Sequence, residues 1–306
     1  MTVPSNTRET YDATQTNGRA AGIREDLSNI IYNIAPDETP FMSGVGKGSC
    51  DNTYFEWQID TLSDPAANRQ IEGDDATALA VVEPDRVGNY TQISSKAVRS
   101  SGTAEAVDFA GRKSTQAYQM AKRAKELKTD MEMMLLLAAQ APTAGGTGVA
   151  RATGSVGNWI ATNAVVGTAV SEDDIKEVME KCWESGASPD ILMCDGVIKQ
   201  AISALSQSVS ELRTAANDKS PAYVVAAVDI YVSDFGNLKI VPNRLMPAET
   251  AYFLDYEFWD ITYLRNFATY DIARTGDSEA QMLIVEYGLR SKNEAANGKV
   301  TGWAAP

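Results

Sequence analysis

Histidine is absent from the 306 residues of this chain, and its absence excludes several classes of catalytic and metal site. It is the side chain most often used for proton transfer near neutral pH and for metal ligation. Serine-histidine-aspartate catalysis, cysteine-histidine catalysis and histidine-based metal hydrolysis are therefore excluded. Cysteine is scarce as well: Cys50, Cys182 and Cys194 form no CxxC pair. We expect buried, reduced thiols rather than a disulfide framework or a zinc site.

Positive charge is scarce too, with 27 lysines and arginines against 41 acidic residues and a net charge of -14. Because nucleic-acid affinity comes chiefly from lysine and arginine displacing counterions, tight and general DNA binding is not expected. No apolar run is long enough to span a bilayer, and the N-terminal residues are polar, unlike a secretory signal. We therefore expect a protein without a membrane partner that folds in a cytoplasm. Its length favours two closely joined domains.

The basic residues that exist are concentrated in one segment. Residues 111–128 contain Arg112, Lys113, Lys122, Arg123, Lys125 and Lys128 against Glu126 alone. Residues 64–86 have the opposite bias, with Asp64, Glu72, Asp74, Asp75, Glu83 and Asp85 against Arg69 and Arg86. Opposite charge blocks on separate segments favour contacts between copies, in which the acidic segment of one copy lies over the basic segment of the next.

Alternating apolar residues predict a projecting two-stranded arm. Residues 52–62 alternate as a half-buried strand does, with Phe55, Trp57 and Ile59 on one face. Residues 87–107 are rich in threonine, serine and valine and are expected to return beside this strand. An isolated hairpin of this kind is only marginally stable, so we expect its apolar face to pack on a neighbouring copy.

A long amphipathic helix is predicted for residues 115–140. Its apolar stripe comprises Met120, Ala124, Leu127, Met131, Met134 and Ala138, and the opposite face carries Lys122, Lys125, Glu126, Thr129 and Glu132. A shorter helical pattern at residues 24–34 is expected to end at Pro36 and Pro40.

The remainder predicts a mixed α/β region followed by strands. A glycine-rich connector at residues 141–159 is the expected domain boundary. The elements expected after it are a helix capped by Ser171 and Asp174 and stopped at Gly186, a strand at 191–194, a helix at 197–205, a hairpin at 228–240, strands at 252–255, 258–267, 282–290 and 300–303, and a charged loop at 271–279.

The sequence GVGKGS at residues 44–49 resembles a phosphate-binding loop. Phe41 stands where that signature has its first glycine, and Gly48 stands where it has serine or threonine. A flexible hinge leading into the arm is therefore favoured over nucleotide binding.

Two pairs of adjacent carboxylates, Asp173 with Asp174 and Asp74 with Asp75, have the residue type that general acid-base catalysis uses. The first pair lies in the first turn of a predicted helix, where acids complement the helix dipole, and the second lies in a polar loop. Solvated charge is the favoured interpretation of both pairs.

Taken in order, these elements resemble one family of proteins. Four local phrases strengthen the resemblance: REDLSNIIYNIAPDETPFMS (24–43), FEWQIDTL (55–62), NWIATN (158–163) and EYGLRSKNEAANGKVTGW (286–303). Over nearly its whole length the chain is similar to the major capsid proteins of tailed bacteriophages with the Hong Kong 97 fold, in the branch typified by phage SU-ten. The resemblance implies an α+β fold.

The resemblance also implies a role for each segment. The implied segments are an N-terminal arm at 1–45, an extended E-loop hairpin and its base at 46–105, a peripheral domain at 106–144 and 251–292 with a spine helix at about 115–140, and an axial domain at 145–250 and 293–306. Implied inter-subunit residues are Phe55, Trp57, Ile59, Glu72, Asp74 and Asp75 of the E-loop and Lys122, Lys125 and Lys128 of the spine; a loop near three-fold contacts carries Asp271, Arg274, Asp277 and Glu279.

As for function, the resemblance implies a structural protein, without enzymatic activity or cofactor, that assembles as hexamers and pentamers into an icosahedral head around double-stranded DNA. Separate scaffolding, portal and decoration proteins are further partners that it allows. Residues 60–86 contain no lysine, so the lysine-asparagine bond that welds some related shells is not expected. The N-terminal region is too short for a cleaved scaffolding segment, so a scaffold would be a separate protein.

Three alternatives stay open. An encapsulin-like compartment has the same fold and would hold cargo enzyme rather than DNA. A carboxylate-dependent hydrolase needs neither histidine nor cysteine, but no feature of the sequence brings two acids together. A phage tail or adhesin β-protein is disfavoured by the long helix.

Overall fold

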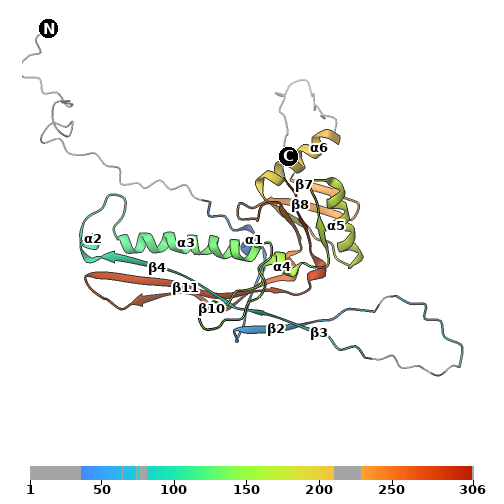
Figure 1. Ribbon diagram of the computed structural model, residues 1–306, viewed down its shortest axis with the longest axis horizontal. Coiled ribbons are helices and arrows are strands. Elements are labelled where there is room, and N and C mark those ends of the chain that lie inside the picture. The colour runs from blue at the N-terminus through green and yellow to red at the C-terminus, as the bar shows by residue number, and fades with distance from the viewer. Residues whose placement is uncertain (1–35, 64, 74, 76–80, 210–228, 305–306) are drawn as a thin grey trace, which may run out of the picture.

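The computed structural model describes residues 36–63, 65–73, 75, 81–209 and 229–304. A four-stranded sheet with a long helix on one face forms one domain, and a six-stranded sheet forms the second (Figure 1). A two-stranded arm projects from the first domain. None of the described helices is long and apolar enough to cross a membrane.

The four-stranded sheet and helix α3 (Thr115–Leu136) lie mostly in the segments that were predicted to form the peripheral domain, and they are called the peripheral domain below. The strands of this sheet, in spatial order, are β1 (Gly46–Ser49), β10 (Trp259–Ile272), β11 (Ser278–Ser291) and β4 (Gln92–Ser101). Strands β10, β11 and β4 are antiparallel, whereas β1 runs parallel to the start of β10. The prediction of a flexible hinge at residues 44–49 is therefore wrong, because most of that segment is an edge strand. Its glycines hid the side-chain alternation by which a strand is identified.

Helix α3 (Thr115–Leu136) lies on one face of this sheet, where the long amphipathic helix was predicted. Ser114 caps its N-terminus by accepting a hydrogen bond from the Ala117 backbone N–H at 3.2 Å. The buried side chains that join helix and sheet are Leu127, Met131, Leu135, Trp259, Ile261, Leu283, Val285, Tyr287 and Leu289. The short helix α2 (Gly102–Ala106) connects β4 to α3.

The six-stranded sheet lies mostly in the segments that were predicted to form the axial domain, and it is called the axial domain below. Its elements follow the prediction closely. In spatial order its strands are β5 (Ala164–Val166), β12 (Gly298–Thr301), β9 (Thr250–Leu254), β6 (Ile191–Cys194), β8 (Gly236–Pro242) and β7 (Ile230–Ser233). Helices α5 (Glu172–Glu184) and α6 (Gly196–Val209) pack on one face. Ser171 caps α5, whereas Asp174 accepts a hydrogen bond from the Trp303 indole N–H at 2.7 Å.

The two domains share a core. Met193, Tyr252 and Leu254, on the face of the axial sheet away from α5, belong to the same buried cluster as Leu127 of α3. The Tyr252 hydroxyl donates a hydrogen bond to the carbonyl oxygen of Leu136 at 3.0 Å. Helix α4 (Val156–Trp159) is buried at this junction, so the end of the glycine-rich connector is packed.

Strand pairing moves two expected boundaries. Strand β9 belongs to the axial sheet, so residues 251–254 leave the peripheral domain, and β4 belongs to the peripheral sheet rather than to the E-loop. Alternation in a sequence marks a strand but does not say which sheet it joins.

Pro40 begins helix α1 (Pro40–Gly44) rather than ending a helix, as suits its fixed φ angle. The helical pattern at 24–34 lies outside the described residues.

Two short 3-10 helices complete the described elements. These are η1 (Tyr256–Phe258), which leads into β10, and η2 (Glu294–Ala296), which precedes β12. Both begin with an asparagine or aspartate, Asp255 and Asn293, whose side chain accepts a hydrogen bond from the backbone two residues on.

A substitution at Gly157 tests the shared core. A Cβ atom there would lie 2.3 Å from the carbonyl oxygen of Ala138, which as backbone has little room to yield. We expect Gly157→Ala to lower the free energy of unfolding by about 1–3 kcal/mol, the usual cost of overpacking. Chemical denaturation of the unassembled subunit measures this. Gly196→Ala is the matched control, because no atom lies within 4 Å of its Cβ position; equal stabilities of the two variants would contradict the packed junction.

Candidate functional site

The base of the E-loop lies on the face of the peripheral sheet opposite α3 (Figure 1). Strands β2 (Tyr54–Ile59) and β3 (Asp85–Tyr90) form its antiparallel pair. Phe55 is 9% exposed and lies over Gly288, where a Cβ atom would be 2.5 Å from its ring. Trp57 stacks on Phe55, with ring centroids 5.8 Å apart, and also contacts Trp159 at 5.5 Å.

This packing changes one sequence-based expectation. Phe55 is buried within its own chain, and Trp57 and Ile59 are half-buried there. The prediction that this face packs on a neighbouring copy is therefore wrong for Phe55. Periodicity identifies an apolar face but not its cover, and the cover here is Gly288 and Trp159, distant in sequence.

Buried polar contacts anchor the same base. The Asn89 side chain donates hydrogen bonds to the Thr153 hydroxyl at 3.0 Å and to the Leu289 carbonyl at 2.6 Å, and accepts one from the Gly154 backbone N–H at 2.9 Å. Asn89 and Thr153 are fully buried. Since buried polar groups need such partners, these contacts tie β3 to the connector and to β11.

A buried carboxylate reinforces this layer. Glu286 of β11, only 3% exposed, accepts from Arg151 at 2.5 Å, from Arg265 at 2.8 Å and from the Thr91 hydroxyl at 2.9 Å. Two guanidinium groups and a hydroxyl thus neutralise and satisfy one buried charge. This arrangement holds the connector against the sheet and leaves the carboxylate no free face for acid-base chemistry.

The tip of the E-loop is acidic and also carries exposed apolar side chains. Glu72 and Asp75 are exposed, whereas Asp74 lies outside the described residues. The exposed apolar residues of this segment are Leu62, Ile71, Val81 and Val82, each between 77% and 99% exposed. The charges were predicted from the sequence, whereas the apolar side chains were not, because they show no periodicity.

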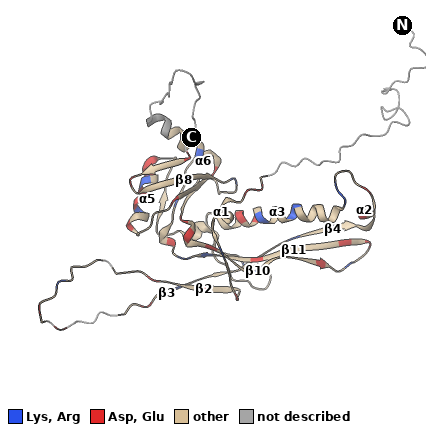
Figure 2. Ribbon diagram, turned by 180° about the vertical axis from the view of Figure 1, so that it is seen from behind, with Lys and Arg blue, Asp and Glu red and all other residues tan. Residues whose placement is uncertain are grey.

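The predicted basic residues lie along α3 (Figure 2). Lys122, Lys125 and Lys128 are exposed. Lys125 forms a 2.7 Å ion pair with Asp37 of its own chain, and the resulting contact lowers the pKa of the Asp37 carboxyl. One of the three lysines is therefore engaged by the segment that leads into α1. The structure does not bring the acidic tip and these lysines together within one chain.

The sequence pattern also placed Glu132 wrongly. It was assigned to the polar face of α3, but it is fully buried. Its carboxylate accepts hydrogen bonds from the backbone N–H groups of Phe41 and Met42 and from the Asn243 side chain, all at 2.8 Å. It thereby caps α1, whose own N-cap Thr39 makes no side-chain bond. A lone charge within the apolar run 131–138 was the available signal of its burial.

The predicted three-fold loop is shorter than expected, because β10 and β11 extend to Ile272 and Ser278. Arg274 pairs with Glu279 across the turn, and Asp271 accepts from the Gln281 side chain at 2.8 Å. The Asp277 carbonyl accepts from the Gly102 backbone N–H at 3.2 Å, which joins the turn to α2. These contacts stiffen the far tip of the peripheral domain.

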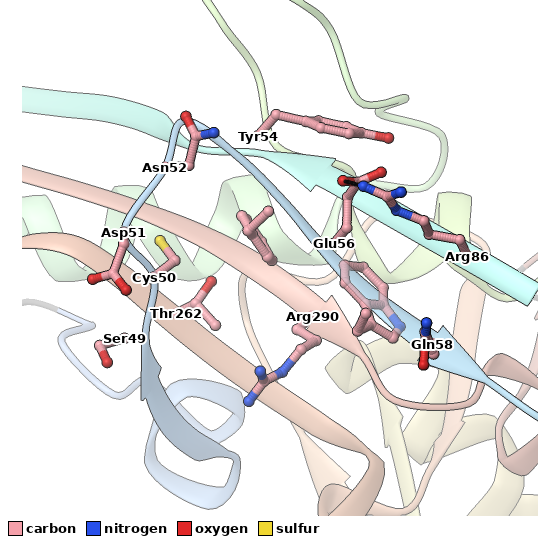
Figure 3. Close-up of a pocket in the computed structure, with 12 residues that line it drawn as sticks. Ser49, Cys50, Asp51, Asn52, Tyr54, Glu56, Gln58, Arg86, Thr262 and Arg290 are labelled. Atoms are coloured by element: carbon pink, nitrogen blue, oxygen red, sulfur yellow. Dashed lines mark hydrogen bonds and ion pairs between the residues drawn. The ribbon is translucent and has the colours of Figure 1, made fainter.

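A hollow of about 530 Å³ lies between the base of the E-loop and β10 (Figure 3). Its lining includes Cys50, Glu56, Thr262 and Arg290. Arg290 is paired with Asp260 at 2.5 Å, and Glu56 with Arg86. These pairs neutralise Glu56, Arg86 and Arg290, and the remaining charged residue of the lining is Asp51.

The cysteines and the adjacent aspartates were the other candidates for chemistry, and their surroundings favour a structural role. Burial raises the pKa values of the Cys182 and Cys194 thiols to about 12, which suits reduced core residues. Asp173 lies in the first turn of α5, as expected of dipole-complementing charge. Within the described part of the chain, no three acidic or cysteine side chains are grouped to hold a metal ion.

Solved structures share this arrangement of two domains, long helix and arm. The fold matches the capsid of a native GTA particle, with a TM-score of 0.65 at 11% identity over 97% of this chain and all of that chain. It also matches Mycobacterium phage Adephagia, with a TM-score of 0.62 at 11% identity over 93% and 96% of the two chains. An encapsulin complex from Synechococcus elongatus PCC 7942 matches at 0.57, with 9% identity over 90% and 92%. The chain therefore has the Hong Kong 97 fold.

Sequence comparison narrows the class to a family. The model of the SU10 major capsid protein family matches residues 4–304, so the chain belongs to that family of phage major capsid proteins. The major capsid protein of Escherichia phage Phieco32 is 28% identical over 330 residues, covering 90% of this chain and 93% of that protein. The predicted family, fold and capsid function are confirmed, and the chain is a structural component of a virion.

Replacement of Glu132 tests its role at the junction. We expect Glu132→Ala to lower the free energy of unfolding of the unassembled subunit by about 1–3 kcal/mol, because buried N–H groups lose their acceptor. Burial raises the pKa of Glu132 despite its three donors. The ionised form is thus disfavoured in the folded state, and stability gained by protonation appears as pH falls through the raised pKa. The alanine variant should therefore lose more free energy of unfolding, relative to the unmodified chain, as the pH falls from neutral toward about pH 5.

Chemical denaturation across this pH range, with Glu180→Ala as an exposed control on α5, measures both effects. A Glu132 variant that behaves like the Glu180 control would show that the carboxylate does not stabilise the junction.

Proposed function

We propose that this chain assembles in the host cytoplasm as hexamers and pentamers that close into an icosahedral head around double-stranded DNA. The observation that carries this proposal is the E-loop, which projects from the body and exposes four apolar side chains that the described part of its own chain does not cover. Such side chains are costly in an isolated subunit and become favourable when a neighbouring copy buries them. Membership of the capsid family supports the same conclusion.

The net charge of -14 supports a container rather than a DNA-binding protein. A wall of the same sign as the phosphate backbone encloses DNA without holding it tightly, so that the genome remains free to leave. Scaffolding, portal and decoration proteins would be separate partners in this assembly.

Contacts between copies would combine apolar burial with charge. A single exposed ion pair contributes only about 0–1 kcal/mol, so the charges select partner and register while apolar burial supplies more of the affinity. Small contributions at many equivalent interfaces then add within one closed assembly.

Electron microscopy tests the assembly directly. Particles of this chain purified from phage-producing cells are expected to be closed, isometric shells, and their ultraviolet absorbance ratio should show nucleic acid that nuclease cannot reach before the shell is opened. Filaments or unassembled subunits would contradict the proposal. Closed shells that hold protein cargo and no DNA would favour the encapsulin-like alternative, whose fold is shared.

The contribution of charge is testable by reversal. We expect the combined replacement of Glu72, Asp74 and Asp75 by lysine to reduce the assembled fraction more at low than at high ionic strength. The reason is that salt screens the repulsion between the new lysines and the positive charge of the neighbouring copy. Light scattering across a salt series measures this. Assembly equal to that of the unmodified chain at low salt would show that these acids face solvent in the shell.

A further inference from the structure

A free strand edge lies at the base of the arm. Strand β2 pairs with β3 along one edge, and no other described strand pairs with it. The Thr91 backbone N–H donates to the Thr53 carbonyl at 2.8 Å, so residue 53 and every second residue after it direct their backbone groups toward β3. The backbone N–H and C=O groups of Tyr54, Glu56 and Gln58 therefore point away from β3.

The hollow of about 530 Å³ lies beside this edge. Tyr54, Glu56 and Gln58 all line it (Figure 3). Thr262 of β10 and Arg290 of β11 line it as well, so the hollow lies between β2 and the peripheral sheet. Its volume is within the range of ligand pockets, about 300–1,000 Å³. An unpaired edge beside such a space is a place where an extended peptide can add a strand.

Two side chains of the lining carry hydrogen-bond donors without an acceptor. The indole N–H of Trp57 and the Nε–H of Arg290 are buried, and neither has a hydrogen-bond partner among the described residues. Buried polar groups in proteins are nearly always paired, so an unpaired group needs an explanation. A bound chain brings carbonyl oxygens into the hollow and supplies acceptors of the kind that these donors lack.

The charge of the lining indicates the kind of chain that fits. Glu56 is paired with Arg86 and Arg290 with Asp260, whereas Asp51 has no ion pair with any described residue. The lining therefore keeps one uncompensated negative charge, just before the start of β2. The chain has a net charge of -14, so the surface of another copy is on average of the wrong sign. A basic segment of a separate protein is the better complement.

We propose that the free edge of β2 binds an extended, basic segment of a separate protein. This segment adds a strand beside Tyr54, Glu56 and Gln58 and places a lysine or arginine near Asp51. Backbone hydrogen bonds give such a contact its affinity, while the hollow and Asp51 select the sequence that binds. The surface belongs to a single subunit, so binding does not require a closed shell. The proposal therefore goes beyond assembly and concerns a partner of the capsid protein.

Two synthetic peptides test the preference for positive charge. Both are capped, fluorescein-labelled chains of alternating valine and threonine, one with lysine at each end and one with glutamate. Fluorescence anisotropy with the unassembled, full-length subunit at low salt measures binding. We expect the lysine peptide to bind about tenfold more tightly, because an ion pair with Asp51 replaces a repulsion. Asp51→Lys should reverse this order. Absence of binding by both peptides, or an unchanged order in the Asp51→Lys variant, would overturn the proposal.

A proline substitution tests strand addition itself. Gln58→Pro removes an N–H group that points away from β3, whereas Gln58→Thr keeps that group and is the matched control. We expect Gln58→Pro to weaken binding of the lysine peptide by about tenfold, and Gln58→Thr to bind as the unmodified chain does. Circular dichroism checks that both variants fold, and size-exclusion chromatography without peptide compares their oligomeric states. Equal binding by the two folded variants would refute strand addition. An oligomer that only Gln58→Pro loses would assign this edge to a contact between copies and would refute the separate partner.

Discussion

The buried carboxylate of Glu132 is the constraint on which the arrangement of the subunit depends. It belongs to α3 but accepts hydrogen bonds from the start of α1 and from Asn243, which follows β8 of the axial domain. Described charges of opposite sign do not contact it, so its ionised form depends on neutral donors held in place by the fold. Phe41 then packs edge-on against Tyr256 and Trp259. One charged group therefore fixes where three distant segments meet.

Buried polar contacts also fix the base of the E-loop, which lies on the other side of the sheet. Asn89 and Glu286 join β3, the connector and β11 through buried polar contacts, while Phe55 fills the space that Gly288 leaves open. Apolar packing alone would allow β2 and β3 to slide, because it is non-directional. Hydrogen bonds with fixed geometry set the position of the arm.

Much of the fold was predictable because its elements have strong local signals. The stripe from Leu127 to Met131 identified α3, and the turn at Asp234 identified the β7–β8 hairpin. Long-range pairing was not predictable. The sequences of β4 and β9 mark each of them as a strand, but they do not say which sheet the strand joins. Of the candidate site, Glu72 and Lys122 are exposed, and their contacts with a neighbouring copy stay a prediction. Phe55 and Glu132 were misplaced because their surroundings come from residues distant in sequence, and no local pattern reports them.

Among the residues that the structure describes, the contacts that hold the arm lie at its base, so the arm can act as a lever. Asn89 and Phe55 form the fulcrum, and the tip of the E-loop lies far from them along the arm (Figure 1). A rotation of a few degrees at the fulcrum displaces the tip in proportion to the length of the arm, while the buried contacts at the base change little. Subunits with one internal structure can thus reach neighbours at different angles. A shell of varying local curvature then needs adjustment at the base of the arm rather than alternative folds of the chain.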